Sequence, residues 1–118
     1  MFLQLAHTKT DVFAASKSFT LECYKVTRSF PPDERFAMTQ QIRRAALSVH
    51  LNIAEGCSRK SEAERKRYFE IARGSVIEID TALDIAIELE YISAENLSIL
   101  GTHLLSTFKQ LSAMIHQR

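Results

Sequence analysis

The chain of 118 residues has few of the residues that interrupt helices, since it contains only three glycines and two prolines. This scarcity allows long helices, and the apolar fraction of 46% is too high for a disordered chain. No apolar run approaches the roughly 20 residues that span a bilayer, and the first residues lack the basic flank and apolar stretch of a signal peptide. The two cysteines, Cys23 and Cys57, make neither a disulfide framework nor a CxxC motif. Isolated cysteines fit a reducing compartment, so we expect one cytoplasmic domain without membrane contact.

Basic residues are missing from one long segment, because no Lys or Arg lies between Gly74 and Phe108. Residues 1–73 carry 13 basic and 8 acidic side chains, a net charge of +5. Residues 74–118 carry 2 basic and 6 acidic side chains, a net charge of −4. This distribution indicates either a charged partner or a second copy of the chain, whose acidic half would meet the basic half of the first.

Apolar residues recur at steps of three and four along the chain, and convincing alternation with a period of two is absent. The first such stripe contains Val12, Phe19 and Val26. Pro31 and Pro32 are expected to end the first helix, because proline disfavours a helical conformation in the residue before it. The pattern predicts four helices, at about residues 9–29, 34–55, 62–90 and 94–117. Four amphipathic helices with short connections predict an all-α, antiparallel up-down four-helix bundle.

Three positions suggest how the later helices end and begin. Gly56 follows the second helix and is expected to adopt the left-handed conformation of a C-terminal cap. Ser61 and Glu64 have the spacing of a capping box at the start of the third helix. Ser93 is expected to cap the fourth.

Small residues on the second and third helices predict a close contact between them. If the two helices are antiparallel around the central turn, Ala45 faces Ala72, and Gly74 lies at the same level. Ser48 then faces Phe69. We expect this contact to be the closest in the bundle, with Gly74 inside it.

Several motifs recur together along the chain: FPPDE, QIRRAALS and NIAEG in the first half, and ARGSVIE and LEYI in the second. In this combination the chain resembles the four-helix bundle proteins encoded within intervening sequences of 23S ribosomal RNA. The similarity spans roughly Val12 to Ile115. One departure is Glu90, where members of that family commonly have glycine.

The resemblance implies a bacterial cytoplasmic protein without known enzymatic activity. Relatives of this family include the accessory variability proteins of diversity-generating retroelements, which assemble as pentamers and bind nucleic acid through basic surface. By this resemblance we expect a homo-oligomer, with a pentamer favoured, and RNA or DNA as a partner. We expect no cofactor, no metal and no small-molecule substrate.

A basic cluster around the central turn is the candidate nucleic-acid site. Cations at a helix N-terminus are disfavoured by the helix dipole, so their presence suggests a bound anion such as phosphate. The alternative is a solvated turn that neighbouring carboxylates balance. The candidate residues are Arg59, Lys60, Arg65, Lys66 and Arg67, with Arg73 further along the helix. Tyr68 could stack on a base, although its place on the inward stripe favours core packing.

A second group of polar residues is assigned structural roles. Arg43 and Arg44 lie one helical turn from Glu78 in the predicted register, so an ion pair within the bundle or across subunits is expected. The alternative is that these two arginines contact phosphate. Asn52 and Glu55 are expected to be hydrogen-bonding or capping groups near the turn.

No arrangement of residues indicates catalysis. His50, Glu55 and Cys57 are close in sequence, but their spacing does not define a nucleophile with its base. The histidines also lack the Glu-x-x-His pairs of di-iron bundles. The leading interpretation is therefore a non-enzymatic, oligomeric bundle that binds nucleic acid or a ribonucleoprotein. The alternative is a structural or protein-interaction oligomer that binds no nucleic acid.

Overall fold

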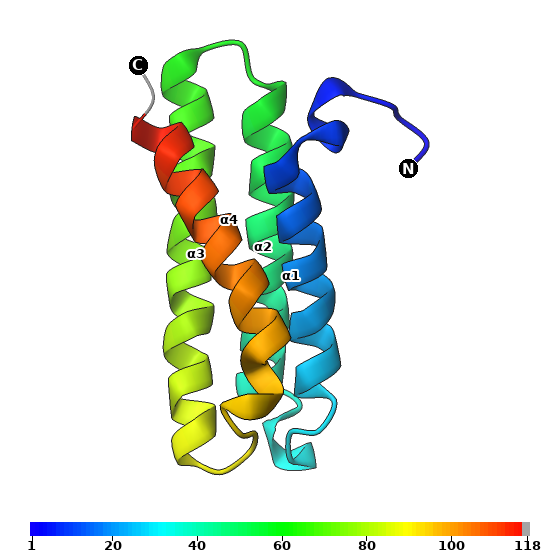
Figure 1. The fold of residues 1–118 in the computed structure, drawn as a ribbon, viewed down its shortest axis with the longest axis vertical. Coiled ribbons are helices and arrows are strands. Elements are labelled where there is room, and N and C mark those ends of the chain that lie inside the picture. The colour runs from blue at the N-terminus through cyan, green and yellow to red at the C-terminus, as the bar shows by residue number, and fades with distance from the viewer. Residues whose placement is uncertain (117–118) are drawn as a thin grey trace.

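A computed structural model describes residues 1–116 and shows an antiparallel up-down bundle of four α-helices (Figure 1). The α-helices are α1 (Asp11–Thr27), α2 (Met38–Ser58), α3 (Glu62–Glu88) and α4 (Ser98–His116). Three short 3-10 helices are η1 (Ala6–Lys9), η2 (Pro32–Glu34) and η3 (Glu95–Leu97). No strand occurs within residues 1–116. The predicted all-α bundle is confirmed.

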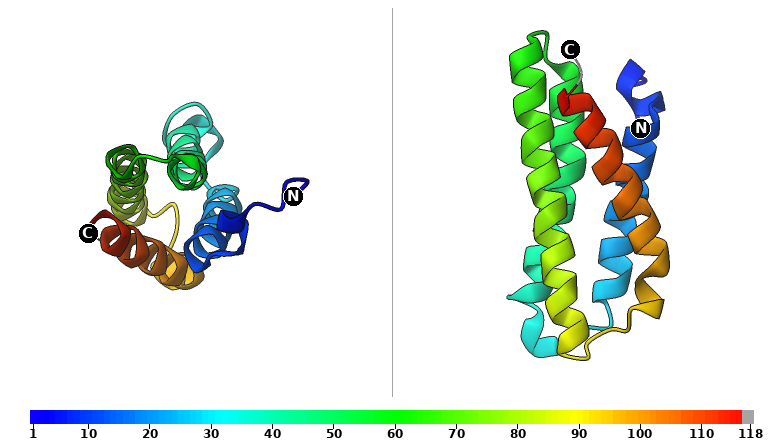
Figure 2. Two further views of the ribbon diagram at one scale, coloured as in Figure 1. Left: turned by 90° about the horizontal axis from the view of Figure 1, so that it is seen from above. Right: turned by 60° about the vertical axis from the view of Figure 1, so that its left-hand side comes forward.

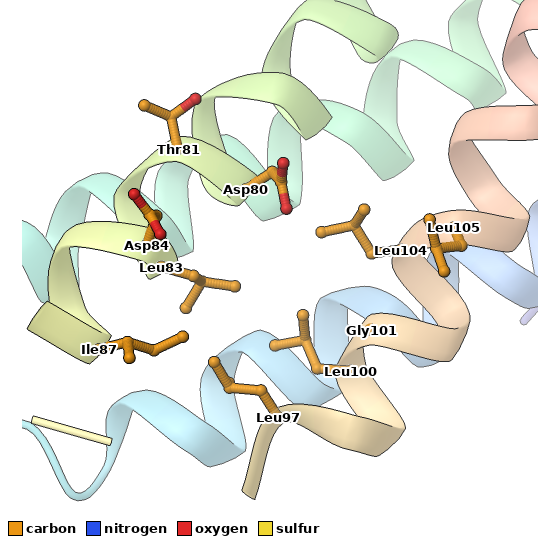
Figure 3. Close-up of a pocket in the computed structure, with 10 residues that line it drawn as sticks. All are labelled: Asp80, Thr81, Leu83, Asp84, Ile87, Leu97, Leu100, Gly101, Leu104 and Leu105. Carbon is orange, nitrogen blue, oxygen red and sulfur yellow. The ribbon is translucent and has the colours of Figure 1, made fainter. Parts of the chain in front are cut away.

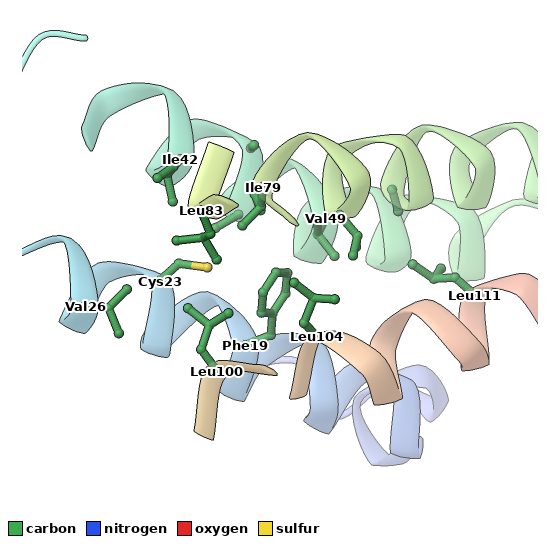
Figure 4. Close-up of a cluster of buried hydrophobic side chains, with 14 of the residues drawn as sticks. Phe19, Cys23, Val26, Ile42, Val49, Ile79, Leu83, Leu100, Leu104 and Leu111 are labelled. Carbon is green, nitrogen blue, oxygen red and sulfur yellow. The ribbon is translucent and has the colours of Figure 1, made fainter. Parts of the chain in front are cut away.

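The core consists of the apolar stripes that the helical spacing predicts. Seen along the bundle, α1 lies beside α2 and α4, and α3 lies beside the same two helices (Figure 2). Phe19 and Val49 are fully buried, as are Ile79 and Leu111, and they lie between the helices at successive levels of the bundle (Figure 4). Each helix therefore contributes one face to a single core, and burial of this apolar surface is the main stabilising contribution.

The helix starts follow the sequence signals only in part. Ser61 accepts a hydrogen bond from the backbone N–H of Glu64 at 3.3 Å, so the predicted cap of α3 is confirmed. The second helix was expected from residue 34, but α2 begins at Met38 because η2 and the irregular backbone of Ala37 (φ −124°, ψ −106°) come first. Ser93 accepts from the N–H of Asn96 in the turn before α4, so the prediction that it caps the fourth helix is wrong, and α4 begins only at Ser98. The expected end of the last helix, residue 117, lies outside the described residues.

Gly56 lies inside α2, so the prediction that it forms a left-handed cap is wrong. The helix continues to Ser58, and none of the glycines has a positive φ. A Cβ at Gly56 would lie 2.6 Å from the Cε1 atom of the Phe69 ring. The absence of a side chain therefore allows Phe69 of α3 to pack against the backbone of α2.

The predicted alignment of α2 and α3 is also wrong in detail. These two helices do form the most extensive helix pair. However, Ser48 lies beside Ser75, whose hydroxyl donates to it at 3.0 Å, and Phe69 lies beside Gly56. Gly74 is exposed, and a Cβ there would meet no atom within 4 Å. The close approach thus occurs nearer to the turn than the small residues suggested.

The C-terminus of α3 is closed by a Schellman motif. Glu90 has a φ of 62°, its N–H donates to the carbonyl of Ile87, and the N–H of Tyr91 donates to the carbonyl of Ala86. This left-handed conformation favours glycine. The predicted end at residue 90 is therefore two residues late, since α3 ends at Glu88.

Polar groups join α1 to α2 along a line that we call the polar seam. Its side chains are Ser16, Thr20 and Thr27 of α1 with His50 and Arg43 of α2. Ser16 Oγ lies 2.7 Å from His50 Nδ1, and Thr20 donates to the Ala46 carbonyl at 3.1 Å. Thr27 accepts from Arg43 Nε at 2.9 Å. These bonds satisfy hydroxyl groups that are almost completely buried.

Replacement of Gly56 by alanine is expected to destabilise the bundle. The new methyl group would collide with the buried Phe69 ring, and overpacking of this kind costs about 1–3 kcal/mol. Gly74→Ala is the matched control, because its methyl group points into open space and removes a helical glycine, which is worth up to about 1 kcal/mol of added stability. Urea denaturation followed by circular dichroism measures both changes, and equal effects of the two substitutions would contradict this packing.

Glu90→Gly is expected to stabilise the protein. Glycine removes the steric penalty of the left-handed conformation, although it also gains freedom in the unfolded chain, so the net gain is about 0.5–1 kcal/mol. Glu88→Gly removes the same side chain from the last turn of α3, where glycine should cost up to about 1 kcal/mol. A thermal melt in which both variants are less stable than the parent would refute the cap assignment.

Candidate nucleic-acid interface

The turn between α2 and α3 brings the predicted basic residues to one end of the bundle (Figure 1). α2 ends at Ser58 and α3 begins at Glu62, so only three residues connect the two helices. The cap formed by Ser61 orients the first turn of α3, and the packing of Phe69 on Gly56 holds the helices together just below it. The basic side chains therefore project from a short and well-defined turn.

Arg65 has a structural role in this turn. Its Nη1 atom donates to the carbonyl of Cys57 at 3.0 Å and to the carbonyl of Arg59 at 3.2 Å. The last carbonyl groups of a helix lack partners within the helix. Arg65 thus caps the C-terminus of α2, and its charge is favourable at that negative end.

Arg59 is held by its neighbours at the surface of the turn. Its Nη2 atom donates to a carboxylate oxygen of Glu55 at 2.8 Å and to the Tyr68 hydroxyl at 3.3 Å. Its guanidinium lies over the Tyr68 ring, 5.1 Å from the centroid. The hydrogen bond to Glu55 raises the pKa of Arg59. The half-buried Tyr68 therefore does not fill the core as expected, and Phe69 takes that position with 3% of its surface exposed.

The other cations of the turn differ in whether they pair with a carboxylate. Lys66 pairs with Glu62 at 3.3 Å, and such exposed pairs contribute little and exchange readily with other anions. Lys60 and Arg67 are exposed, and within residues 1–116 neither forms a salt bridge. These two side chains, with Lys66, are the cations most available to a phosphate group.

Arg73 lies apart from the turn. It follows Arg67 by six positions, or about 9 Å along the helix axis. Its guanidinium lies 5.6 Å from the Phe108 ring centroid and donates to the Ser112 hydroxyl at 3.4 Å. The structure therefore places Arg73 at the contact between α3 and α4 and not within the basic cluster.

The expected ion pair between Arg43 and Glu78 is not formed. Besides bonding Thr27, Arg43 donates to the Tyr24 carbonyl at 3.2 Å and lies 5.0 Å from the Tyr24 ring centroid, so it joins α2 to α1. Glu78 instead accepts from the Gln41 side chain at 3.0 Å. The prediction failed because the spacing on α2 does not show which neighbouring helix a long side chain will reach.

The remaining polar residues have local roles. Asn52 donates to the Ser48 carbonyl at 2.8 Å and to its hydroxyl at 3.1 Å, which is the hydrogen-bonding role expected for it. Glu55 pairs with Arg59. Arg44 is exposed, and no ion pair to Glu78 is formed by it.

The residues considered for catalysis have different surroundings. His50 faces α1, and burial lowers its pKa, with Lys17 and His7 adding to this effect. Burial raises the pKa of the Cys57 thiol, so it remains protonated near neutral pH. Sequence reasoning missed the contact between Ser16 and His50, although a serine on an apolar stripe signals a buried polar bond. The Ser16 side chain is fully buried and therefore acts as a connection between helices.

The fold and the turn define a helical bundle with a basic end, and comparison with known proteins identifies its family. The chain belongs to the family described as 23S rRNA-intervening sequence protein, whose model matches residues 8–117. No curated protein matches the chain. None of the helices described within residues 1–116 is long and apolar enough to cross a membrane.

A solved structure with a similar fold comes from Bacteroides thetaiotaomicron VPI-5482. It is a protein of unknown function from the S23 ribosomal protein family, and it is 26% identical to this chain. The match covers 90% of this chain and 99% of the other, with a TM-score of 0.79. The bundle described above is therefore shared with this protein of the S23 ribosomal protein family.

Arg65→Gln is expected to destabilise the bundle, unlike the neighbouring substitution Arg67→Gln. The first variant removes charged hydrogen bonds to the carbonyl of Cys57 in the last turn of α2 and to the carbonyl of Arg59 just after it, which should lower the free energy of unfolding by about 1–2 kcal/mol. The second removes an exposed charge and should change it by less than about 0.5 kcal/mol. Urea denaturation of the two variants tests the structural role of Arg65, and indistinguishable midpoints would contradict it.

Proposed function

We propose that this protein is a non-enzymatic, self-associating helical bundle of the bacterial cytoplasm that binds nucleic acid through its basic turn. The observation that carries the proposal is the exposure of Lys60 and Arg67 beside a rigid turn, where neither is paired with a carboxylate of the described chain. Lys66 adds a third cation, whose exposed partner Glu62 is easily replaced by a phosphate group.

The rigidity of the turn supports this role. Arg65 and Ser61 fix the ends of α2 and α3 through backbone hydrogen bonds, so the free cations project from an ordered frame. Contacts to phosphate groups carry no sequence information. We therefore expect affinity for RNA or DNA that depends weakly on sequence and strongly on salt.

Self-association would strengthen such binding. Two or three cations in one copy make a weak site, but several copies that present the same turn can bind one nucleic acid together. A pentamer remains the favoured assembly. The second candidate function is that of a structural oligomer without nucleic-acid binding, and the exposed apolar side chains of the bundle favour self-association in either case.

The double variant Lys60→Gln/Arg67→Gln is expected to bind nucleic acid more weakly. If both side chains contact phosphate groups, the slope of log affinity against log salt should decrease in magnitude by roughly 2 for each copy in contact. Fluorescence anisotropy with labelled single-stranded RNA and double-stranded DNA, at low and moderate salt, measures both quantities.

The matched control is Lys25→Gln/Arg28→Gln, which removes two exposed charges from the opposite end of the bundle. It should leave the salt slope unchanged. Light scattering on each variant verifies that its mass is that of the parent. Absence of binding at low salt would favour the structural oligomer, whereas equal losses in the two double variants would contradict binding through the basic turn.

A further inference from the structure

An apolar groove with an acidic rim lies between α3 and α4 and has a volume of about 510 Å³ (Figure 3). We call it the acidic groove. Leu83 and Leu104 point into it, and Leu105 lies at its edge with 57% of its surface exposed (Figure 3). Asp80 and Asp84 stand one helical turn apart on its rim. The groove therefore combines an apolar floor with two carboxylates at its edge.

Gly101 of α4 forms part of the wall of the groove. A Cβ at Gly101 would meet no atom within 4 Å, so the missing side chain leaves space in the wall of the groove. A second hollow of about 250 Å³ continues along the same two helices and shares Asp80, Leu104 and Leu105 with the first. The acidic groove can therefore accept a large side chain with neighbouring groups beside it.

A complementary surface lies on the other side of the bundle, where α1 meets α2 and the segment before it. We call it the Phe36 ridge, after its most exposed apolar side chain. It consists of Arg35, Phe36, Arg44 and Leu47, which also line a hollow of about 280 Å³. Phe36 is 77% exposed and Leu47 is 41% exposed. The Arg35 guanidinium lies 5.1 Å from the Phe36 ring centroid. The ridge thus combines an exposed aromatic ring with two exposed cations.

Within residues 1–116, the charges of the two surfaces form no ion pair. The ion pairs found in residues 1–116 join Arg59 to Glu55 and Lys66 to Glu62. Neither rim aspartate and neither ridge arginine takes part in them. Since no Lys or Arg occurs between Gly74 and Phe108, the rim of the groove also lacks cations from its own two helices near it.

We infer that a second copy of this chain inserts its Phe36 ridge into the acidic groove of the first. Phe36 would enter the apolar floor, while Arg35 and Arg44 would meet Asp80 and Asp84. Charge complementarity identifies the occupant: the aspartates repel a nucleic acid, whereas the ridge supplies both the apolar ring and the cations. This inference rests on the self-association included in the proposed function, and it names the surfaces that associate.

The positions of the two surfaces determine the kind of assembly. α1 and α2 form one side of the bundle, and α3 and α4 form the opposite side (Figure 2). Residues 35–47 begin α2, whereas residues 80–87 end α3 and residues 97–105 begin α4, so both surfaces lie at the same end of the antiparallel bundle. Two different surfaces in contact make a heterologous interface, which builds rings or open chains from copies side by side. The basic turn at the other end remains uncovered.

The experiment uses two variants that each damage one surface, Phe36→Asp and Leu105→Asp. Both side chains are largely exposed, so neither substitution removes core packing. Light scattering coupled to gel filtration at micromolar concentration should show a parent protein larger than a monomer and two variants that are monomers. In an equimolar mixture, the intact ridge of one variant fits the intact groove of the other, so a complex with twice the monomer mass should form and grow no further.

Leu21→Asp is the matched control, because Leu21 is 60% exposed on α1 and lines neither surface. It should keep the mass of the parent. A monomeric parent, variants that retain the parent mass, or a mixture that stays monomeric would each overturn the inference. The measured masses test the interface between copies, whereas the titration with Lys60→Gln/Arg67→Gln tests nucleic-acid binding. Failure of the inferred interface can therefore be distinguished from failure of the proposed nucleic-acid binding.

Discussion

The contact of the Phe69 ring with the backbone at Gly56 is the constraint on which the basic end of this bundle depends. It fixes how far α3 is displaced along α2, and thereby which groups meet across the turn. With this alignment, Arg65 reaches the Cys57 carbonyl in the last turn of α2, and Arg59 lies over Tyr68. Lys60 and Arg67 then remain at the surface. With a different displacement, other basic side chains would bond to neighbouring groups of the bundle, and a different set would face solvent.

The helical stripes could be predicted from the sequence because burial follows the helical period. The relative displacement of the helices could not, since a stripe of alanine and serine residues looks the same at several alignments. Gly56 illustrates the problem. Near the expected end of a helix, glycine is typical of a left-handed cap, but it also permits close packing, and only the neighbouring ring decides between the two. Gly74, by contrast, was expected inside the contact between α2 and α3, but it faces solvent.

The candidate site was predictable as a cluster but not in its parts. Five basic residues within nine positions mark the turn clearly. Whether each one is free depends on carbonyl groups and rings that the fold brings near, so Arg65 could not be separated from Arg67 beforehand. The same holds for Arg43, which was expected to reach α3 and instead bonds α1. Long side chains have several neighbours within reach, and the helix alignment selects one.

The polar seam has a consequence for how the bundle opens. A shift of α1 along α2 would separate Ser16 from His50 and Thr27 from Arg43, and would take these partners away from two half-buried side chains of α2, so the two helices resist sliding. The contact of α3 with α4 is less extensive than that of α1 with α2, and it is interrupted by the acidic groove. Local stability in a protein is uneven, and regions with fewer packed contacts open first. Backbone amides of α4 would therefore exchange with solvent before those of α2, and transient openings of the monomer would begin on the α3–α4 side.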